Sequence, residues 1–196
     1  RLARRLRATG ISSFVRYLDD LEAGRMGDEW EAFTNALTTN LTSFFREAHH
    51  FPLLAEHVKK LSGPITIWCS ASSTGEEPYS IAMTVCEAFN TLTPPVTIIA
   101  TDIDTNVLAT AANGVYNLDR LEKMPADRAR RFFLRGKGDR EGVGVERGRK
   151  RSTRGHQRLE GFGDVQFVKQ HAPQAWRPGE VPGVVGEGAK ARLAGV

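Results

Sequence analysis

The stretch from Ile65 to Ser80 constrains the fold of this chain more than any other. It opens with a β-branched apolar run and passes through small residues to Gly75, after which a helix pattern begins. Pro78 suits the first turn of that helix, where its missing N–H costs nothing. The apolar positions on one face of this helix are Tyr79, Ala82, Met83, Cys86 and Phe89. Strand, tight turn and helix in this order indicate the opening of a nucleotide-binding α/β unit.

The turn in this stretch differs from the dinucleotide-binding fingerprint. Ala71, Ser73 and Gly75 take the three small positions that three glycines would otherwise fill. Glu76 and Glu77 stand where a pyrophosphate would bind; they would repel it, but they suit an ammonium or sulfonium group. The turn therefore favours S-adenosylmethionine over NAD or ATP. Taken alone, the stretch is equally compatible with a buried strand followed by an ordinary acidic helix start.

A second buried strand is predicted from Val96 to Ala100, and acidic residues follow it. We expect it to lie parallel to the first strand. An acid at the tip of this strand is the group that accepts ribose hydroxyl hydrogens in Rossmann-like sites. Asp104 is expected to cap the helix that follows, over residues 105–112. Asp102, which is closer to the strand, is the better ribose ligand.

The first forty residues predict a small all-helical unit. Its first helix is very basic, and its second has Ser12-Ser13 at its start and an apolar face built around Phe14 and Leu18. The basic end is either a solvated helix face or a docking surface for an anionic partner. Its cationic residues are Arg1, Arg4, Arg5 and Arg7.

The segment from Thr38 to Phe51 combines hydroxyls, an amide, aromatic rings and an arginine, and so could hold a carboxylate or a ribose. His49-His50 does not predict a metal site, because adjacent histidines on a helix point in different directions. Pro52 is expected to open the helix that leads to the first strand.

Composition narrows the class of protein further. With 40% hydrophobic residues, 196 residues can form a real core. No apolar run approaches the roughly 20 residues of a membrane span. The two cysteines lie on predicted core elements, as in a reduced, cytoplasmic protein. The net charge of +4 permits acidic partners and does not require nucleic acid.

Three motifs in order resemble the chemotaxis receptor methyltransferases of the CheR family. They are Thr38–Thr42 with Phe44–Pro52, then Ser72–Ser80, then Thr101–Asp104. The resemblance runs from residue 1 to about Gly142. It implies a small all-α domain followed along the chain by a Rossmann-like α/β methyltransferase domain. It also implies methyl transfer from S-adenosylmethionine to glutamate side chains on the cytoplasmic helices of chemoreceptors.

The resemblance also implies roles for individual residues. Arg46 would lie at the methyl-transfer site, and the basic first helix would dock the receptor. The cofactor would be bound by Asn40, Thr42, Arg46, Ala71, Ser73, Gly75, Asp102 and Glu76 or Glu77. No metal, nucleic acid or membrane insertion is expected, and we expect a monomer.

The resemblance divides the chain into a helical domain over 1–39, a linker over 40–51, a partial methyltransferase domain over 52–142 and a tail over 143–196. Residues 165–168 resemble the next family strand, but the Asn-Leu and Cys-Arg-Asn-Val segments expected after it are absent.

Residues 136–196 hold 13 of the 19 glycines and no isoleucine, so we expect an irregular or out-of-frame tail. We also expect an incomplete enzyme with little or no methyl transfer. The alternatives are a basic tail that binds nucleic acid or anionic lipid, and a non-catalytic module that docks on acidic helical partners.

Overall fold

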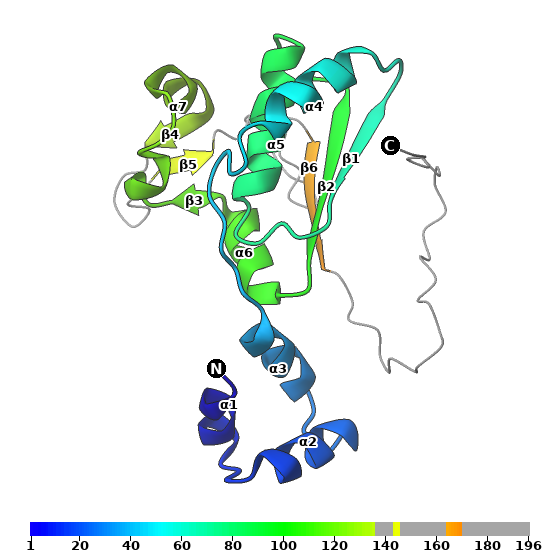
Figure 1. Ribbon diagram of the computed structural model, residues 1–196, viewed down its shortest axis with the longest axis vertical. Coiled ribbons are helices and arrows are strands. Elements are labelled where there is room, and N and C mark those ends of the chain that lie inside the picture. Colours follow the sequence, from blue (N-terminus) through cyan, green and yellow to red (C-terminus); the bar gives the residue numbers. More distant parts are fainter. Residues whose placement is uncertain (136–142, 146–163, 170–196) are drawn as a thin grey trace, which may run out of the picture.

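The computed structural model describes residues 1–135, 143–145 and 164–169. Figure 1 shows three N-terminal helices at one end of the molecule and a parallel sheet with its helices at the other. In chain order the elements are α1 (Leu2–Thr9), α2 (Phe14–Glu22), α3 (Glu29–Leu37), α4 (His50–Lys59), β1 (Ile65–Cys69), α5 (Glu76–Ala88), β2 (Val96–Asp102), α6 (Thr105–Asn113), β3 (Val115–Tyr116), the 3₁₀ helix η1 (Leu118–Leu121), α7 (Ala126–Phe132), β4 (Phe133–Arg135), β5 (Val143–Val145) and β6 (Asp164–Lys169).

The N-terminal helices form the small helical unit that the sequence predicts. The hydroxyl of Ser13 caps α2 by accepting from the Arg16 amide. The guanidinium of Arg5 on α1 donates two hydrogen bonds to Glu29 on α3, at 2.8 and 2.6 Å. The hydroxyl of Tyr17 on α2 donates to the same carboxylate at 2.7 Å. One half-buried carboxylate therefore joins the three helices.

This cluster shifts the pKa values of its members. Hydrogen bonding from Arg5 is the main cause that holds the pKa of Glu29 below its usual range. Burial, and next the hydrogen bond to Glu29, raises the pKa of Tyr17 to about 12. Glu29 is thus ionised and Tyr17 neutral across the ordinary pH range.

The larger sheet has the strand order β1-β2-β6, and all its pairs are parallel. Ile65 pairs with Val96 and Ile98 pairs with Val165, so the two strand predictions and the later strand at 165–168 are confirmed. Three parallel strands in sequential order form one half of a Rossmann-like sheet. Their carboxyl ends lie at the same edge, where ligands bind in such folds.

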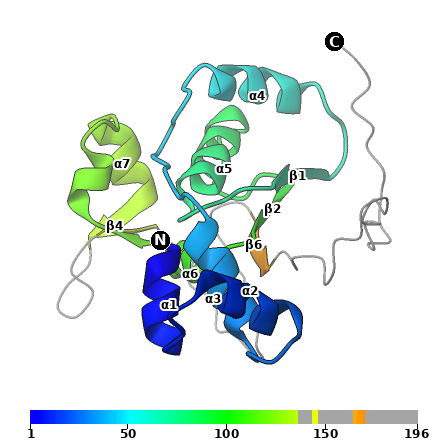
Figure 2. The same ribbon diagram turned by 60° about the horizontal axis from the view of Figure 1, so that its bottom comes forward.

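The helix α5 is buried nearly all round, which its sequence pattern does not reveal. The predicted apolar face is buried from Tyr79 to Cys86 and half-buried at Phe89. Ser80, Ile81, Thr84 and Val85 are buried as well. The cause is a second layer, because α4 packs against the side of α5 that faces away from the sheet (Figure 2). Ser80 and Thr84 are tolerated because their hydroxyls donate to backbone carbonyls one turn earlier, at 2.6 and 2.8 Å. The helix α4 itself begins at His50, two residues before the expected Pro52.

A small antiparallel sheet with the order β3-β5-β4 lies beside α5 and was not predicted from the sequence. Its strands have two or three residues each, too few for an alternating pattern to stand out. Phe44 packs edge-on against Tyr116 of β3 and Phe133 of β4, with ring centroids 5.0 and 5.4 Å apart. This sheet therefore holds the linker against the core.

The turn between β1 and α5 depends on Gly75. Its φ of +100° lies in the region that favours glycine. A Cβ placed there would lie 2.6 Å from the hydroxyl oxygen of Tyr116 and 2.9 Å from the Cβ of Ala111. That hydroxyl donates to the Thr74 carbonyl at 2.8 Å, so the turn is held tightly against α6 and β3. Glycine is needed here because protein atoms occupy the space.

Most of the tail lies outside the described residues. The predictions of an irregular or out-of-frame tail, of a basic tail that binds nucleic acid or anionic lipid, and of missing Asn-Leu and Cys-Arg-Asn-Val segments fall there. Among the described helices, none has both the length and the apolar character that a membrane span requires.

Replacing Glu29 tests the helical unit through its pH dependence. Because the pKa of Glu29 is lower in the folded chain, its contribution is complete well above pH 4.5 and is lost as the pH falls through the folded-state pKa. Glu29→Gln should destabilise the unit by about 2 kcal/mol at pH 7, and by progressively less as the pH falls below the ordinary carboxyl pKa. Thermal unfolding from pH 7 to pH 3 measures this, with the exposed Glu22→Gln as control. A difference that does not change with pH would contradict the assignment.

Replacing Gly75 tests the packing of the turn. Gly75→Ala combines an unfavourable φ with a clash against Tyr116, and should cost about 2–4 kcal/mol. Gly24→Ala is the matched control, since its φ is +67° but nothing lies within 4 Å of its Cβ position. Chemical denaturation compares the two variants. Equal losses would show that backbone strain alone, and not close packing, requires glycine at position 75.

Candidate cofactor site

Two loops meet at the carboxyl ends of β1 and β2. The Ser72 amide donates to the Thr101 carbonyl at 2.9 Å, which extends the strand pairing beyond the end of β1. The Ser73 amide then donates to Oδ2 of Asp102 at 2.8 Å. The turn that leads into α5 and the acid at the tip of β2 are therefore joined by a direct hydrogen bond.

Asp102 is 7% exposed, and its charge is compensated by backbone donors. Oδ2 accepts from Ser73, and Oδ1 accepts from the Asp104 amide at 2.9 Å. A carboxylate oxygen can accept two hydrogen bonds, so each oxygen keeps capacity for one further donor. The site thus fits a ligand that brings two hydroxyls to this strand end.

The backbone of the turn before α5 is strained, and the hydrogen bond to Asp102 helps to hold it in that conformation. Ser73 has a φ of +48°, uncommon for a residue with a side chain. The hydroxyls of Ser72 and Ser73 are buried without a hydrogen-bond partner among the described residues. Such strain and unmet polar groups are concentrated at ligand sites. Ala71, by contrast, is exposed at the mouth of the turn.

The two adjacent glutamates have different surroundings. Glu76 is fully buried; one of its oxygens accepts from the Thr74 hydroxyl at 2.6 Å, and the other lies 3.6 Å from the Arg120 guanidinium. Glu77 is exposed. It belongs to the first turn of α5, which follows the turn after β1. Burial, and next the negative charge of Glu77, raises the pKa of the Cys69 thiol to about 12. Glu76 has internal partners, whereas Glu77 remains available to a ligand.

The linker between α3 and α4 is fixed at several points. Asn40 donates to Oδ2 of Asp104 at 2.8 Å, and the Thr42 carbonyl accepts from Arg120 at 3.3 Å. Phe45 is held by a bond from its amide to the Ser80 hydroxyl at 2.9 Å, and by the Arg128 guanidinium 4.2 Å above its ring. These contacts keep the linker near the two strand ends.

Arg46 lies in the most strained part of the linker. Its neighbours Phe45 and Glu47 both have a φ of +53°. The exposed guanidinium of Arg46 donates to the Leu41 carbonyl at 3.0 Å. A guanidinium has five N–H donors, so most of its capacity remains for a carboxylate.

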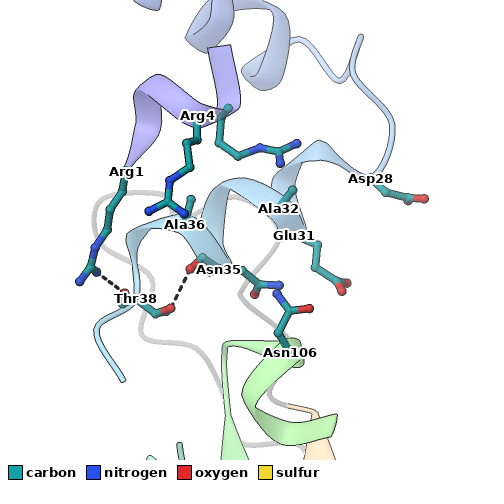
Figure 3. A pocket seen from close by; sticks show the side chains of 10 residues that line it. Arg1, Arg4, Asp28, Glu31, Ala32, Asn35, Ala36, Thr38 and Asn106 are labelled. Carbon is teal, nitrogen blue, oxygen red and sulfur yellow. Dashed lines mark hydrogen bonds between the residues drawn. The ribbon is translucent and has the colours of Figure 1, made fainter. Parts of the chain in front are cut away.

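The four N-terminal arginines divide into two kinds. Arg5 is paired with Glu29, and Arg1 donates to the end of α3, to the Thr38 carbonyl and the Thr39 hydroxyl. Arg4 and Arg7 are exposed. Arg1 and Arg4 line a groove of about 640 Å³, whose other walls come from α3 and the start of α6. Figure 3 shows the side chains that line this groove. In the described ranges, no group of three or more His, Cys, Asp or Glu side chains is arranged to hold a metal.

The sequence did not predict two features of this site: the presence of Arg120, and the hydrogen bonds from the linker to Asp104. Arg120 belongs to a 3₁₀ helix and contacts residues that are 44 and 78 positions away in the sequence. No local pattern predicts such contacts. Asp104 was identified as a helix cap, which the structure confirms through its bonds from the Asn106 and Val107 amides. Its second set of partners comes from the linker and could not be read from spacing.

Comparison with known proteins agrees with this geometry. Residues 1–38 match the family model described as the CheR methyltransferase all-alpha domain. Residues 40–151 match the CheR methyltransferase SAM binding domain. The chain is 52% identical over 143 residues to a chemotaxis protein methyltransferase of Salmonella typhimurium, covering 73% of this chain and 50% of the relative.

Other relatives have similar coverage. The chain is 54% identical over 145 residues to chemotaxis protein methyltransferase 2 of Pseudomonas aeruginosa, covering 72% of this chain and 51% of the relative. It is 50% identical over 143 residues to the Escherichia coli chemotaxis protein methyltransferase, covering 73% and 50%. The chain spans about half the length of these curated relatives. It belongs to the CheR methyltransferase family, with the all-α domain followed by the S-adenosylmethionine-binding domain.

Proposed function

We propose that this chain binds S-adenosylmethionine at the carboxyl ends of β1 and β2 and serves methyl transfer to glutamate side chains of chemoreceptors. The observation that carries the proposal is Asp102, a buried carboxylate with spare acceptor capacity that is hydrogen-bonded to the turn before α5. Its oxygens suit the two ribose hydroxyls. Membership in the family supports the same cofactor.

A second carboxylate determines the kind of ligand. Glu77 is exposed in the first turn of α5, where it suits the ammonium group of the cofactor's methionine part. The same charge disfavours the pyrophosphate of NAD or the phosphates of ATP. The turn is formed by small residues, Ala71, Ser73 and Gly75. The buried Glu76 stabilises it by accepting a hydrogen bond from Thr74. Of the two glutamates, Glu77 is therefore the proposed ligand.

The reaction depends on alignment of the substrate carboxylate with the methyl group and requires no proton transfer. When bound, the cofactor supplies a methyl group on a sulfonium, which is already a good leaving group. A glutamate carboxylate is ionised at pH 7, so no general base is needed. Arg46 would hold that substrate carboxylate in line with the methyl group, and Asn40 and Thr42 would keep the linker over the site. Exclusion of water by the linker then favours the reaction.

Docking to the receptor is proposed for the exposed part of the basic helix. Arg4 and Arg7 are free to meet an acidic helical partner, whereas Arg1 and Arg5 hold the helical unit together. A non-catalytic docking module would use the same two residues, and only methyl transfer separates the two functions. We propose that the chain acts as a monomer in the cytoplasm, where the receptor helices lie.

Ligand binding tests the cofactor and the two carboxylates separately. Calorimetry should give tighter binding of S-adenosylmethionine and S-adenosylhomocysteine than of NAD or ATP. Asp102→Asn should weaken both these ligands and 5′-methylthioadenosine, which keeps the ribose but lacks the ammonium group. Glu77→Gln should weaken only the ligands with the ammonium, by about 1.5 kcal/mol or roughly tenfold.

Glu56→Gln, an exposed change on α4, is the matched control and should bind like the unmodified chain. Tighter binding of ATP, or a Glu77→Gln variant that binds S-adenosylmethionine normally, would contradict the proposed site.

We expect little or no methyl transfer by this chain, including when the cofactor is bound. Residues 170–196 contain neither the Asn-Leu nor the Cys-Arg-Asn-Val segment that the family resemblance implies for the far side of the cofactor. Imperfect alignment of about 1 Å can cost on the order of a hundredfold in rate. Labelled S-adenosylmethionine and receptor-containing membranes measure turnover, with the full-length Salmonella relative as control. Turnover close to that control would contradict this expectation.

A further inference from the structure

Asp104 makes more contacts than a helix cap requires. It is 3% exposed, and its two oxygens have different partners. Oδ1 accepts from the amides of Asn106 and Val107 at 3.0 and 3.4 Å, which caps α6. Oδ2 accepts from the Thr38 hydroxyl at 2.7 Å and from the Asn40 side-chain amide at 2.8 Å. The second oxygen therefore bonds to the linker and not to the helix.

The charge of Asp104 is not explained by capping alone. Asparagine, serine and aspartate cap helices about equally well, and burying a carboxylate is costly unless it is fully hydrogen-bonded. Four donors meet this carboxylate, and two of them come from residues more than 60 positions away. The Thr38 hydroxyl has one proton and lies close to both Asp104 and the Asn35 carbonyl; the charged acceptor forms the stronger bond.

Neighbouring contacts fix the same junction. The Asn35 side chain donates to the Thr105 hydroxyl at 3.0 Å and accepts from the Thr105 amide at 3.3 Å. Figure 3 shows Asn35 and Thr38 at the end of α3, with Asn106 of α6 facing Asn35. The end of the helical unit is therefore fastened to the first turn of α6.

The junction continues directly to the proposed ribose ligand. The backbone amide of Asp104 donates to Oδ1 of Asp102, whose Oδ2 accepts from Ser73. A continuous path of hydrogen bonds thus runs from Thr38 and Asn40 through Asp104 and Asp102 to the turn before α5.

We propose that Asp104 is a positioning residue that latches the start of the linker onto the cofactor site. This deepens the proposed function and rests on it. The amide nitrogen of Asn40 is engaged by Asp104, so Asn40 contributes to cofactor affinity by holding the linker in place. Asp104 itself does not touch the cofactor; it acts through Asn40 and Asp102.

An exchange of partners tests the latch. Asp104→Asn keeps a good cap but replaces the linker-facing acceptor by a donor or a weaker acceptor. Asn40→Asp brings a second carboxylate against Asp104. In the double variant Asp104→Asn/Asn40→Asp, the side-chain amide at position 104 can donate to the carboxylate at position 40, so the pair is restored with donor and acceptor exchanged. The latch predicts that each single variant loosens the linker and that the double variant tightens it again.

Chymotrypsin cleavage after Leu41 reports the linker without any ligand. The Leu41 side chain is 75% exposed, so its accessibility does not limit cleavage. The cleavage rate therefore depends on how often the surrounding backbone opens to enter the protease. Cleavage there should rise at least tenfold in either single variant and return to within about threefold of the unmodified chain in the double variant. Cleavage after Leu53, exposed on α4 and remote from the latch, is the internal control. Thermal unfolding of each variant verifies that the fold is kept, and Thr38→Val gives a milder second probe.

Affinity for S-adenosylhomocysteine is measured on the same variants. It should fall in the single variants, where cleavage rises, and recover in the double variant, where cleavage returns. Unchanged cleavage after Leu41 in Asp104→Asn would overturn the latch. Recovery of the linker without recovery of affinity would overturn the indirect role of Asn40 and indicate direct contact with the cofactor. A chain that binds no cofactor, but whose linker opens and closes as predicted, would support the latch and contradict the proposed function.

Discussion

The structure depends on the hydrogen bond from the Ser73 amide to the Asp102 carboxylate. It joins the turn after β1 to the end of β2 and compensates a charge that would otherwise be costly to bury. Asp104 continues the same arrangement, because its amide satisfies Asp102 and its side chain satisfies the linker and α6. Two buried carboxylates thereby set the relative positions of three loops, and those loops surround the proposed site.

The distribution of charge explains why one cofactor class fits this half-sheet. Backbone donors leave Asp102 able to accept ribose hydroxyls, and the exposed Glu77 adds negative charge where other Rossmann-like sites receive phosphate. The neighbouring Glu76 is directed into the protein and is compensated by Thr74 and Arg120. The two adjacent glutamates thus have different proposed roles: Glu77 binds the ligand and Glu76 stabilises the turn.

The sequence predicted the parallel pairing of β1 with β2, the strand β6, the caps of α2 and α6, and the family, because each rests on local pattern or on motif spelling. It did not predict that α5 is buried nearly all round, since the outer side of α5 is covered by α4. It placed Gly75 among the cofactor-binding residues but did not predict that Tyr116 and Ala111 fill the space beside it. It left Glu76 and Glu77 undistinguished and missed Arg120, because long-range packing decides both.

The central claim is that Asp102 and Glu77 together define an S-adenosylmethionine site at the ends of β1 and β2. A crystal structure of the chain with S-adenosylhomocysteine tests it most directly. The account predicts ribose hydroxyls within about 3 Å of the Asp102 oxygens and the ammonium within about 3 Å of the Glu77 carboxylate. A ligand seated elsewhere, for example in the groove beside Arg1 and Arg4, would contradict it.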